Sequence, residues 1–194
     1  MTYVALLRGI NVGGRNRLRM VDLRVCLERR GFRSVSTYIQ SGNVIFESDL
    51  TDRAKLTTAM RRALTAEFGY DSPILVRSRD QLKAVVARAP REWKSRTDLR
   101  RYVAFLREPL TAKQALKELD PKHGVDFVKA GDGVLYMSTL LRHLKQSGFT
   151  KVVGKEIYRD MTIRNYGTCQ KILALMQREP GATRLVTKQL PRDP

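Results

Sequence analysis

The feature that most constrains the fold is an order of secondary-structure signals that occurs twice along the 194 residues. Each half begins with a short apolar run typical of a buried strand, continues into a helical pattern, and then has two strand patterns joined by a glycine-containing turn. A second helical pattern follows in each half. This order is the signature of the ferredoxin-like, or split β-α-β, unit. The sequence therefore predicts an α+β fold of two ferredoxin-like β-α-β-β-α units, whose antiparallel sheets carry helices on one face.

The strand patterns give positions for this prediction. They lie at residues 3–7, 35–39, 44–47 and 73–77 in the first half, and at residues 102–106, 125–129 and 134–138 in the second. Towards the end of the second half, the pattern predicts a helix through residues 140–144, a short strand over 152–158 and a last helix over 165–178. The second unit is thus expected to repeat most of the first.

Local hydrogen-bonding signals mark three helix ends. Ser78 and Gln81 have the spacing of a capping box, in which two side chains satisfy free N–H groups at a helix start. Thr111 and Gln114 have the same spacing. Gly69 follows an amphipathic helical stretch and stands where a glycine commonly ends a helix. These signals predict helices that begin after residues 78 and 111 and a helix that ends at residue 69.

The periodic patterns are interrupted in residues 90–99, which include Trp93. We place the boundary between the units there. The predicted organisation is a first ferredoxin-like subdomain over 1–90, a linker over 91–100, a second ferredoxin-like subdomain over 101–180 and a C-terminal tail over 181–194. Because large aromatic side chains often dominate interfaces, Trp93 is also a candidate anchor for an assembly partner.

The balance of charge restricts the classes of partner. Lys and Arg number 37 against 19 Asp and Glu, which gives a net charge of +18. The basic residues are spread over both halves rather than gathered in a tail. Charge of this size supports attraction to polyanions but says nothing about fold.

The cysteines and apolar runs indicate a compartment. Cys26 and Cys169 each fall in a helical pattern far apart in sequence and are expected to be buried, reduced thiols. The apolar run at the N-terminus is too short for a signal-peptide core, and no stretch approaches the length of a membrane span. The chain is therefore expected to be cytoplasmic, with no membrane partner.

Three stretches of sequence together carry a family resemblance. They are Leu6-Leu7-Arg8-Gly9-Ile10-Asn11-Val12-Gly13-Gly14, then Thr37-Tyr38-Ile39-Gln40-Ser41-Gly42-Asn43-Val44, and then Thr162-Ile163-Arg164-Asn165-Tyr166-Gly167-Thr168. With them the chain resembles the domain of unknown function 1697 family of small bacterial proteins. That family has Trp-Asn where this chain has Tyr166-Gly167. The resemblance implies two ferredoxin-like subdomains and no established activity.

The loop over residues 9–14 is the first candidate site. Glycines let backbone N–H groups converge on an anion, and flanking arginines would add forked donors. The spacing matches neither the dinucleotide fingerprint nor the P-loop, so a plain strand-to-helix turn that needs positive φ explains it equally well. The ligand-binding candidates in and beside this loop are Arg8, Asn11, Gly13, Gly14 and Arg17.

Two further stretches supply polar candidates. Ser41 and Asn43 lie in a predicted hairpin turn and would present a hydroxyl and an amide. Arg164 and Asn165 precede the last predicted helix, where Asn165 is a plausible N-cap. An arginine at a helix start opposes the helix dipole, so a bound anion would relieve it.

The sequence leaves open whether any reaction is catalysed. A serine nucleophile at position 41 would need a base, and His123 and His143 are the two histidines of the chain. Neither histidine has a nearby cysteine or a paired carboxylate at metal-ligand spacing, so we predict no metal site and no cofactor.

Three functions remain as alternatives. The polar loop candidates favour an anionic small ligand bound in a cleft between the two subdomains. The positive charge favours a nucleic-acid-binding protein, for RNA or single strands, although no segment matches the aromatic signature of RNA-recognition domains. The third alternative is an assembly module without a ligand. The choice between small anion and nucleic acid stays undecided from the sequence, as does the oligomeric state.

Overall fold

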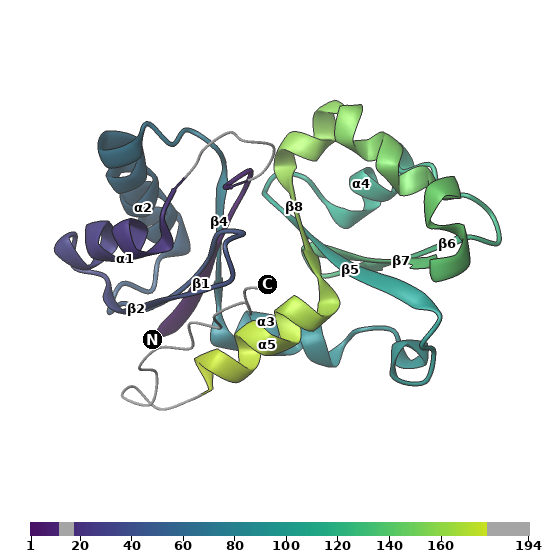
Figure 1. Ribbon diagram of the computed structural model, residues 1–194, viewed down its shortest axis with the longest axis horizontal. Coiled ribbons are helices and arrows are strands. Elements are labelled where there is room, and N and C mark those ends of the chain that lie inside the picture. The colour runs from purple at the N-terminus through teal and green to yellow at the C-terminus, as the bar shows by residue number, and fades with distance from the viewer. Residues whose placement is uncertain (12–17, 178–194) are drawn as a thin grey trace, which may run out of the picture.

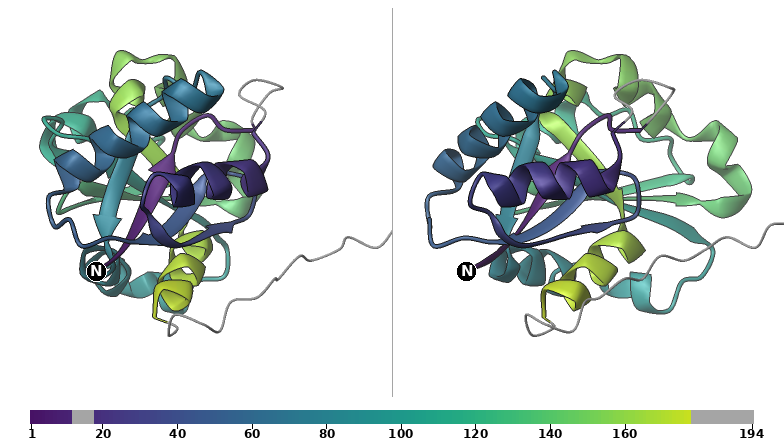
Figure 2. Two further views of the ribbon diagram at one scale, coloured as in Figure 1. Left: turned by 90° about the vertical axis from the view of Figure 1, so that its left-hand side faces the viewer. Right: turned by 60° about the vertical axis from the view of Figure 1, so that its left-hand side comes forward.

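The first unit is a four-stranded antiparallel sheet with two helices on its outer face. The computed structural model describes residues 1–11 and 18–177. The strands pair in the order β2-β3-β1-β4. The elements are β1 (Thr2–Leu7), α1 (Met20–Arg29), β2 (Arg33–Tyr38), β3 (Asn43–Glu47), α2 (Arg53–Phe68) and β4 (Ile74–Ser78). Figure 2 shows α1 and α2 lying across the outer face of this sheet, with the second unit behind it.

The second unit repeats this topology. Its strands pair in the order β6-β7-β5-β8, again antiparallel throughout. The elements are β5 (Leu99–Leu106), α4 (Ala112–Glu118), β6 (Asp126–Gly131), β7 (Val134–Leu140) and β8 (Met161–Asn165). Both orders are those of the ferredoxin-like unit, in which the first strand lies between the third and the fourth. The predicted α+β class and the doubled unit are confirmed.

Two helices lie between the sheets. Helix α3 (Arg79–Ala87) follows β4 directly, and α5 (Tyr166–Met176) follows β8 in the same way. They pack against each other at one end of the space between the two sheets (Figure 1). The inner face of each sheet therefore meets the other unit, while α1, α2 and α4 cover the outer faces.

The alternation of β1 shows how the core is divided. Tyr3, Ala5 and Leu7 pack towards α1 and α2, whereas Val4 and Leu6 join a cluster that includes residues of β5, β7 and α5. Because side chains alternate between the two faces of a strand, an apolar strand of this kind is buried on both sides. The two units consequently share one central core.

Trp93 belongs to this shared core. Its ring is 3% exposed and lies edge-on to Tyr136 and Tyr166, with centroid distances of 5.9 and 5.0 Å. It lies in a 3₁₀ turn, η1 (Arg91–Lys94), within the predicted linker. The side chain thus packs the two units together, and its burial leaves no surface for the external interface that we considered.

The helix signals were predicted well, but the end of the second unit was not. Both capping boxes form, at Ser78–Gln81 and at Thr111–Gln114, and Gly69 ends α2 with φ of 62°. Residues predicted as a helix over 140–144 and a strand over 152–158 instead form three 3₁₀ segments, which are η2 (Leu141–Gln146), η3 (Gly148–Gly154) and η4 (Glu156–Asp160). The strand that completes the sheet is β8, which we had not predicted; its last residue, Asn165, falls at the start of the predicted last helix over 165–178. Within the described residues, no helix is both long and apolar enough to span a membrane.

Candidate functional site between the two units

The two units are related residue by residue around β4 and β8. Arg77 of β4 pairs with Val4 of β1, and Arg164 of β8 pairs with Val103 of β5. Leu7 and Leu106 end the first strand of each unit, and their backbone N–H groups donate to Gly42 and Gly133 of the adjoining hairpins. Arg77 and Arg164 therefore occupy equivalent positions.

Each of these arginines reaches the other unit. Arg164 Nη2 donates to the carbonyl oxygen of Leu7 at 2.7 Å. Arg77 Nη2 donates to the carbonyl oxygen of Leu106 at 3.0 Å. The fourth strand of each unit is thus tied to the end of the first strand of the other, on both sides of the shared core.

The contact of Arg164 is the more extensive of the two. Its Nε donates to Asn43 Oδ1 at 2.6 Å, and its Nη2 also lies 3.1 Å from the carbonyl oxygen of Ser41. Burial lowers the pKa of the Arg164 guanidinium to about 10, so it stays charged at neutral pH. Within the described part of the chain, no carboxylate lies within ion-pair distance of it. Neutral amide and carbonyl oxygens therefore stabilise this charge.

The β2–β3 hairpin accepts hydrogen bonds from Arg164, and its backbone conformation depends on Gly42 and Asn43. The connection from β2 to β3 is the four residues 39–42, so Asn43 is the first residue of β3 rather than a turn residue as predicted. Asn43 is fully buried, and its Nδ2 donates to Tyr38 O and to Ser41 Oγ. Gly42 has φ of 73° and lies against Leu7. These residues fix the positions of the oxygen atoms that accept hydrogen bonds from Arg164.

Asn11 holds the base of the first candidate loop. Its Nδ2 donates to the carbonyl oxygens of Leu18 and Gln40 at 2.9 and 3.0 Å, and its Oδ1 accepts from Leu18 N at 2.8 Å. Asn11 is therefore engaged with backbone groups of this loop and of the β2–β3 hairpin. The other loop candidates Gly13, Gly14 and Arg17 lie outside the described residues.

Arg8 is the candidate that faces a cleft. Its guanidinium lies over the ring of Tyr158 at 4.4 Å, and its Nη1 is 3.4 Å from the carbonyl oxygen of Arg159. Its backbone is fixed by Tyr70, whose hydroxyl accepts from Arg8 N and donates to Arg8 O. Burial raises the pKa of Tyr70 to about 12, so this hydroxyl keeps its proton at neutral pH.

The cleft beside Arg8 lies between the units and has a volume of about 490 Å³. This volume falls within the usual range of small-molecule sites, roughly 300–1,000 Å³. Three of the lining side chains are cationic and one is anionic. The lining residues are Arg8, Val153, Gly154, Lys155, Glu156, Tyr158 and Arg159.

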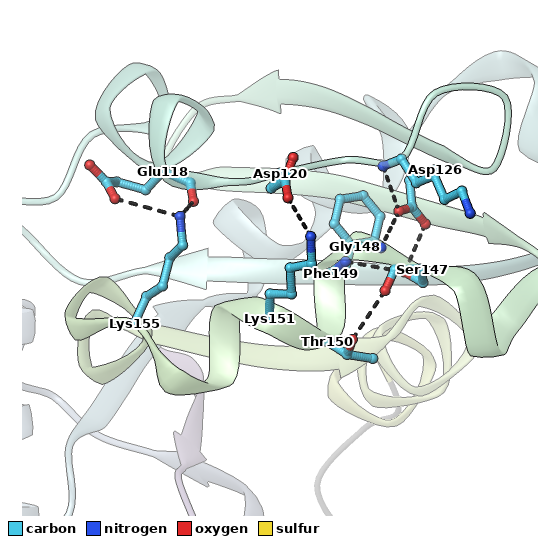
Figure 3. Close-up of polar contacts among 10 residues, drawn as sticks. Glu118, Asp120, Asp126, Ser147, Gly148, Phe149, Thr150, Lys151 and Lys155 are labelled. Carbon is cyan, nitrogen blue, oxygen red and sulfur yellow. Dashed lines mark hydrogen bonds and ion pairs between the residues drawn. The ribbon is translucent and has the colours of Figure 1, made fainter.

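Polar contacts hold the segment that forms the far wall (Figure 3). Asp126 accepts from Ser147 Oγ at 2.8 Å and from Gly148 N at 2.7 Å. Lys151 donates to Asp120, and Lys155 donates to the backbone oxygen of Glu118. This anchoring places Tyr158 and Arg159 against Arg8 and holds the ammonium of Lys155 at Glu118.

The structure separates the predicted residues into groups. Ser41, Asn43 and Arg164 come together, and Arg8 stands on the cleft nearby, next in sequence to Leu7. Asn165 is exposed and makes no capping hydrogen bond with its side chain, so it lies apart from this group. Ser41 Oγ accepts from Asn43 Nδ2, and no bond joins it to a histidine in the described residues.

Sequence reasoning missed the far wall of the cleft. We had interpreted residues 152–158 as a strand, in which neighbouring side chains point to opposite faces. In the structure, Lys155 is an extended residue between η3 and η4, and Tyr158 N donates to its carbonyl oxygen to close the 3₁₀ turn that follows. The alternation of a strand therefore does not describe this segment. The signal was present as two cations flanking a tyrosine in Lys155-Glu156-Ile157-Tyr158-Arg159.

These features define a class of protein: a doubled ferredoxin-like chain whose units share a core, exchange arginine contacts and border a basic cleft. The chain belongs to the family described as "Protein of unknown function (DUF1697)", whose model matches residues 1–136. The matched region contains the first two signature stretches and ends before Arg164.

A solved structure shows a similar fold. It is described as "The structure of conserved bacterial protein SP0830 from Streptococcus pneumoniae". It is 27% identical to this chain with a TM-score of 0.78, and the alignment covers 91% of this chain and 98% of that one. No curated protein matches the chain. The similarity therefore extends over both units and supplies no activity.

Proposed function

We propose that the protein binds an anionic small ligand in the cleft between its two units, at Arg8. The observation that carries this proposal is the cleft that Arg8 of the first unit lines together with Lys155 and Arg159 of the second. The ammonium of Lys155 pairs with Glu118, so Arg8 and Arg159 supply the unpaired cations of this cleft among the described residues. Arg8 lies over Tyr158 and makes no ion pair within the described residues. An arginine in this position keeps donors for a carboxylate or a phosphate.

The environment of Arg8 supports binding rather than a purely structural role. Arg164 uses its donors on oxygens of the protein, whereas Arg8 makes one long contact to a carbonyl oxygen. Its backbone is fixed on both sides by Tyr70. A fixed backbone and a side chain with unused donors are what a preorganised anion site requires.

Nucleic acid remains the alternative, and the net charge of +18 favours it. Most of the usual sheet surface for stacking bases is covered, because the inner strands β1, β3 and β7 are buried along both faces. Of the strand aromatics, Tyr3, Phe46, Phe105 and Tyr136 are buried and Phe127 is exposed. A nucleic acid would thus contact the surface mainly through phosphates, with strongly salt-dependent affinity.

The reduced state of the cysteines supports a cytoplasmic location in this proposal. Cys26 and Cys169 are both free and buried. Thiols of this kind persist in a reducing compartment.

The test is a thermal-shift screen followed by calorimetry with citrate and inorganic phosphate. We expect at least one anion to raise the melting temperature of the parent chain, and the variant Arg159→Gln to lower the affinity about tenfold or more. Arg62→Gln is the matched control, because Arg62 is an exposed residue of α2 outside the cleft. Equal loss in both variants would show that general charge attracts the anion and would contradict the proposal.

Anisotropy titrations with labelled single-stranded RNA and DNA distinguish the alternative. At two salt concentrations, with heparin as competitor, we expect binding to disappear near physiological salt. Sub-micromolar binding that survives physiological salt and prevails over heparin would favour the nucleic-acid function instead.

A further inference from the structure

A second cleft occupies the position equivalent to the Arg8 cleft. Arg107 follows Leu106 as Arg8 follows Leu7, and it lies on a cavity of about 420 Å³. This cavity is formed by α2 and β4 of the first unit and by the residues after β5 of the second. Its polar lining includes Asp52, Arg53, Thr58, Arg77, Arg107 and Glu108. The internal repeat thus produces two interunit clefts rather than one.

Two of the three arginines on this cavity make no ion pair in the described part of the chain. Arg107 pairs with Asp160, whereas Arg53 and Arg77 have no carboxylate within ion-pair distance. Arg77 is half-buried, and burial together with the positive charge of Arg53 lowers its pKa to about 10. The Arg77 guanidinium remains protonated at neutral pH. Because arginine side chains carry a positive charge, Arg53 and Arg77 together concentrate positive charge on the cavity.

The carboxylates on the cavity form no ion pair with Arg53 or Arg77 among the described residues, although the charges of Glu108 and Asp132 favour the charged form of Arg77. Asp52 Oδ1 accepts from Ala54 N at 2.8 Å and from Lys55 N at 3.2 Å, and so caps α2. Glu108 is exposed and makes no ion pair among the described residues. It can therefore accept a hydrogen bond from a ligand hydroxyl at the margin of the cavity.

The comparison with Arg164 shows what Arg77 lacks. Asn43 provides the amide oxygen that accepts from Arg164 Nε. The equivalent residue of the second hairpin is Val134, whose side chain has no acceptor. The equivalence follows from the strand register, in which Val134 is opposite Phe105 and Asn43 is opposite Leu6. Among the described residues Arg77 donates only to the carbonyl oxygens of Val76 and Leu106. The buried charge of Arg77 is therefore less fully hydrogen-bonded than that of Arg164.

We propose that this second cleft binds a hydroxylated phosphate monoester, such as a polyol or sugar phosphate, between Arg53 and Arg77. The forked donors of two arginines suit a phosphate, and the Thr58 hydroxyl adds a donor at the same wall. Glu108 faces the hydroxylated part of the ligand. This site is separate from the Arg8 cleft and does not depend on that cleft being occupied.

Calorimetric titration of the full chain with glycerol 3-phosphate tests the proposal. We expect binding that Arg53→Gln weakens about tenfold or more and Arg159→Gln leaves within about twofold, with Arg62→Gln as the charge-matched control on α2. Thr58→Val is expected to weaken binding several-fold without removing a charge. Circular dichroism and melting temperature establish that each variant is folded.

Each other outcome has a distinct meaning. Loss of binding in Arg159→Gln alone would assign glycerol 3-phosphate to the Arg8 cleft, which overturns this inference and supports the proposed function. If Arg53→Gln and Arg62→Gln weakened glycerol 3-phosphate binding equally, the loss would come from net charge alone, which overturns the inference. Absence of glycerol 3-phosphate binding at millimolar concentration would overturn it as well, while citrate binding could still support the Arg8 site.

Discussion

Arg164 Nε donates to Asn43 Oδ1 at 2.6 Å, across 121 positions of sequence, and so joins the third signature stretch to the second. The same guanidinium reaches the carbonyl oxygen of Leu7, at the end of β1 in the first stretch. These stretches therefore meet at one interunit contact. We call the hydrogen bonds of Arg164 to Asn43 and Leu7 the clamp. Its structural role is to fix the two units relative to each other and so to shape the cleft beside Arg8.

A double-mutant cycle measures this clamp. We expect Asn43→Ala and Arg164→Met each to lower the free energy of unfolding, with a coupling energy of roughly 1.5–3 kcal/mol, as for a hydrogen bond to a charged group. Urea denaturation provides the measurement. In a control cycle, Asn43→Ala combined with Arg33→Met should be additive to within about 0.5 kcal/mol, because Arg33 pairs with Asp49 and shares no partner with Asn43. Additivity in the first cycle would contradict the clamp.

Gly42→Ala is expected to destabilise the chain more than Gly69→Ala. Both glycines have positive φ, which costs an alanine about 1–2 kcal/mol. A Cβ at position 42 would also lie 2.9 Å from Leu7 Cβ, whereas nothing lies within 4 Å of a Cβ at position 69. Overpacking of this kind adds about 1–3 kcal/mol. If urea denaturation showed the same loss of unfolding free energy for both variants, the hairpin would be able to move away from Leu7 without cost.

Elements fixed by interactions between neighbouring residues could be predicted from the sequence, whereas elements fixed by distant residues could not. Ser78–Gln81 and Thr111–Gln114 form capping boxes from residues three apart, so local sequence determines them. Strand β8 is five residues long and runs straight into α5, and its pairing with β5 depends on residues about sixty positions earlier. Its local pattern therefore could not be separated from the helix that follows.

The candidate site shows the same limit. Glycine and asparagine in the second signature stretch indicated a polar turn, but they could not indicate that Arg164 would occupy it. Lys155 and Arg159 were hidden because a 3₁₀ segment has a period between those of helix and strand. Ferredoxin-like order was predictable from apolar periodicity, whereas the clefts arise from how two such units pack.

The pH dependence of stability should reveal the thiol of Cys169. Burial raises its pKa from 9.0 to about 12, so the unfolded chain loses this proton at lower pH than the folded chain. Stability from this group is present below pH 9 and decreases as the pH rises towards 12, by about 1.4 kcal/mol at pH 10. Urea denaturation under reducing conditions at pH 8 and pH 10 should show a smaller decrease for Cys169→Ala than for the parent.

The difference between the two proteins is the informative quantity in that experiment. The lowered pKa values of Arg77 and Arg164, both about 10, act in the opposite direction near pH 10, because the folded chain then binds fewer protons at these groups. Both arginines are present in parent and variant alike, and Cys169→Ala also removes the electrostatic interaction between Cys169 and Arg164. An identical change with pH in both proteins would show that Cys169 ionises in the folded state as readily as in the unfolded one.

Asp126→Asn is expected to loosen the far wall of the Arg8 cleft. Asp126 is 7% exposed and accepts from Thr139 Oγ1 and Ser147 Oγ, and from the backbone N–H groups of Lys122 and Gly148. An amide would direct its own N–H groups at these donors, which should cost roughly 2–3 kcal/mol of unfolding free energy. Amide hydrogen exchange over residues 147–160 should become faster.

Asp120→Asn is the matched control on the same wall. Asp120 pairs with Lys151, and both side chains are more than 60% exposed, so the change should leave the free energy of unfolding nearly unchanged. Segment 147–160 carries Lys155, Tyr158 and Arg159, so any anion that binds at Arg8 should bind more weakly to Asp126→Asn than to Asp120→Asn. Faster exchange with unchanged anion affinity would show that binding does not require an ordered far wall. The anion would then depend on the Arg8 side of the cleft alone.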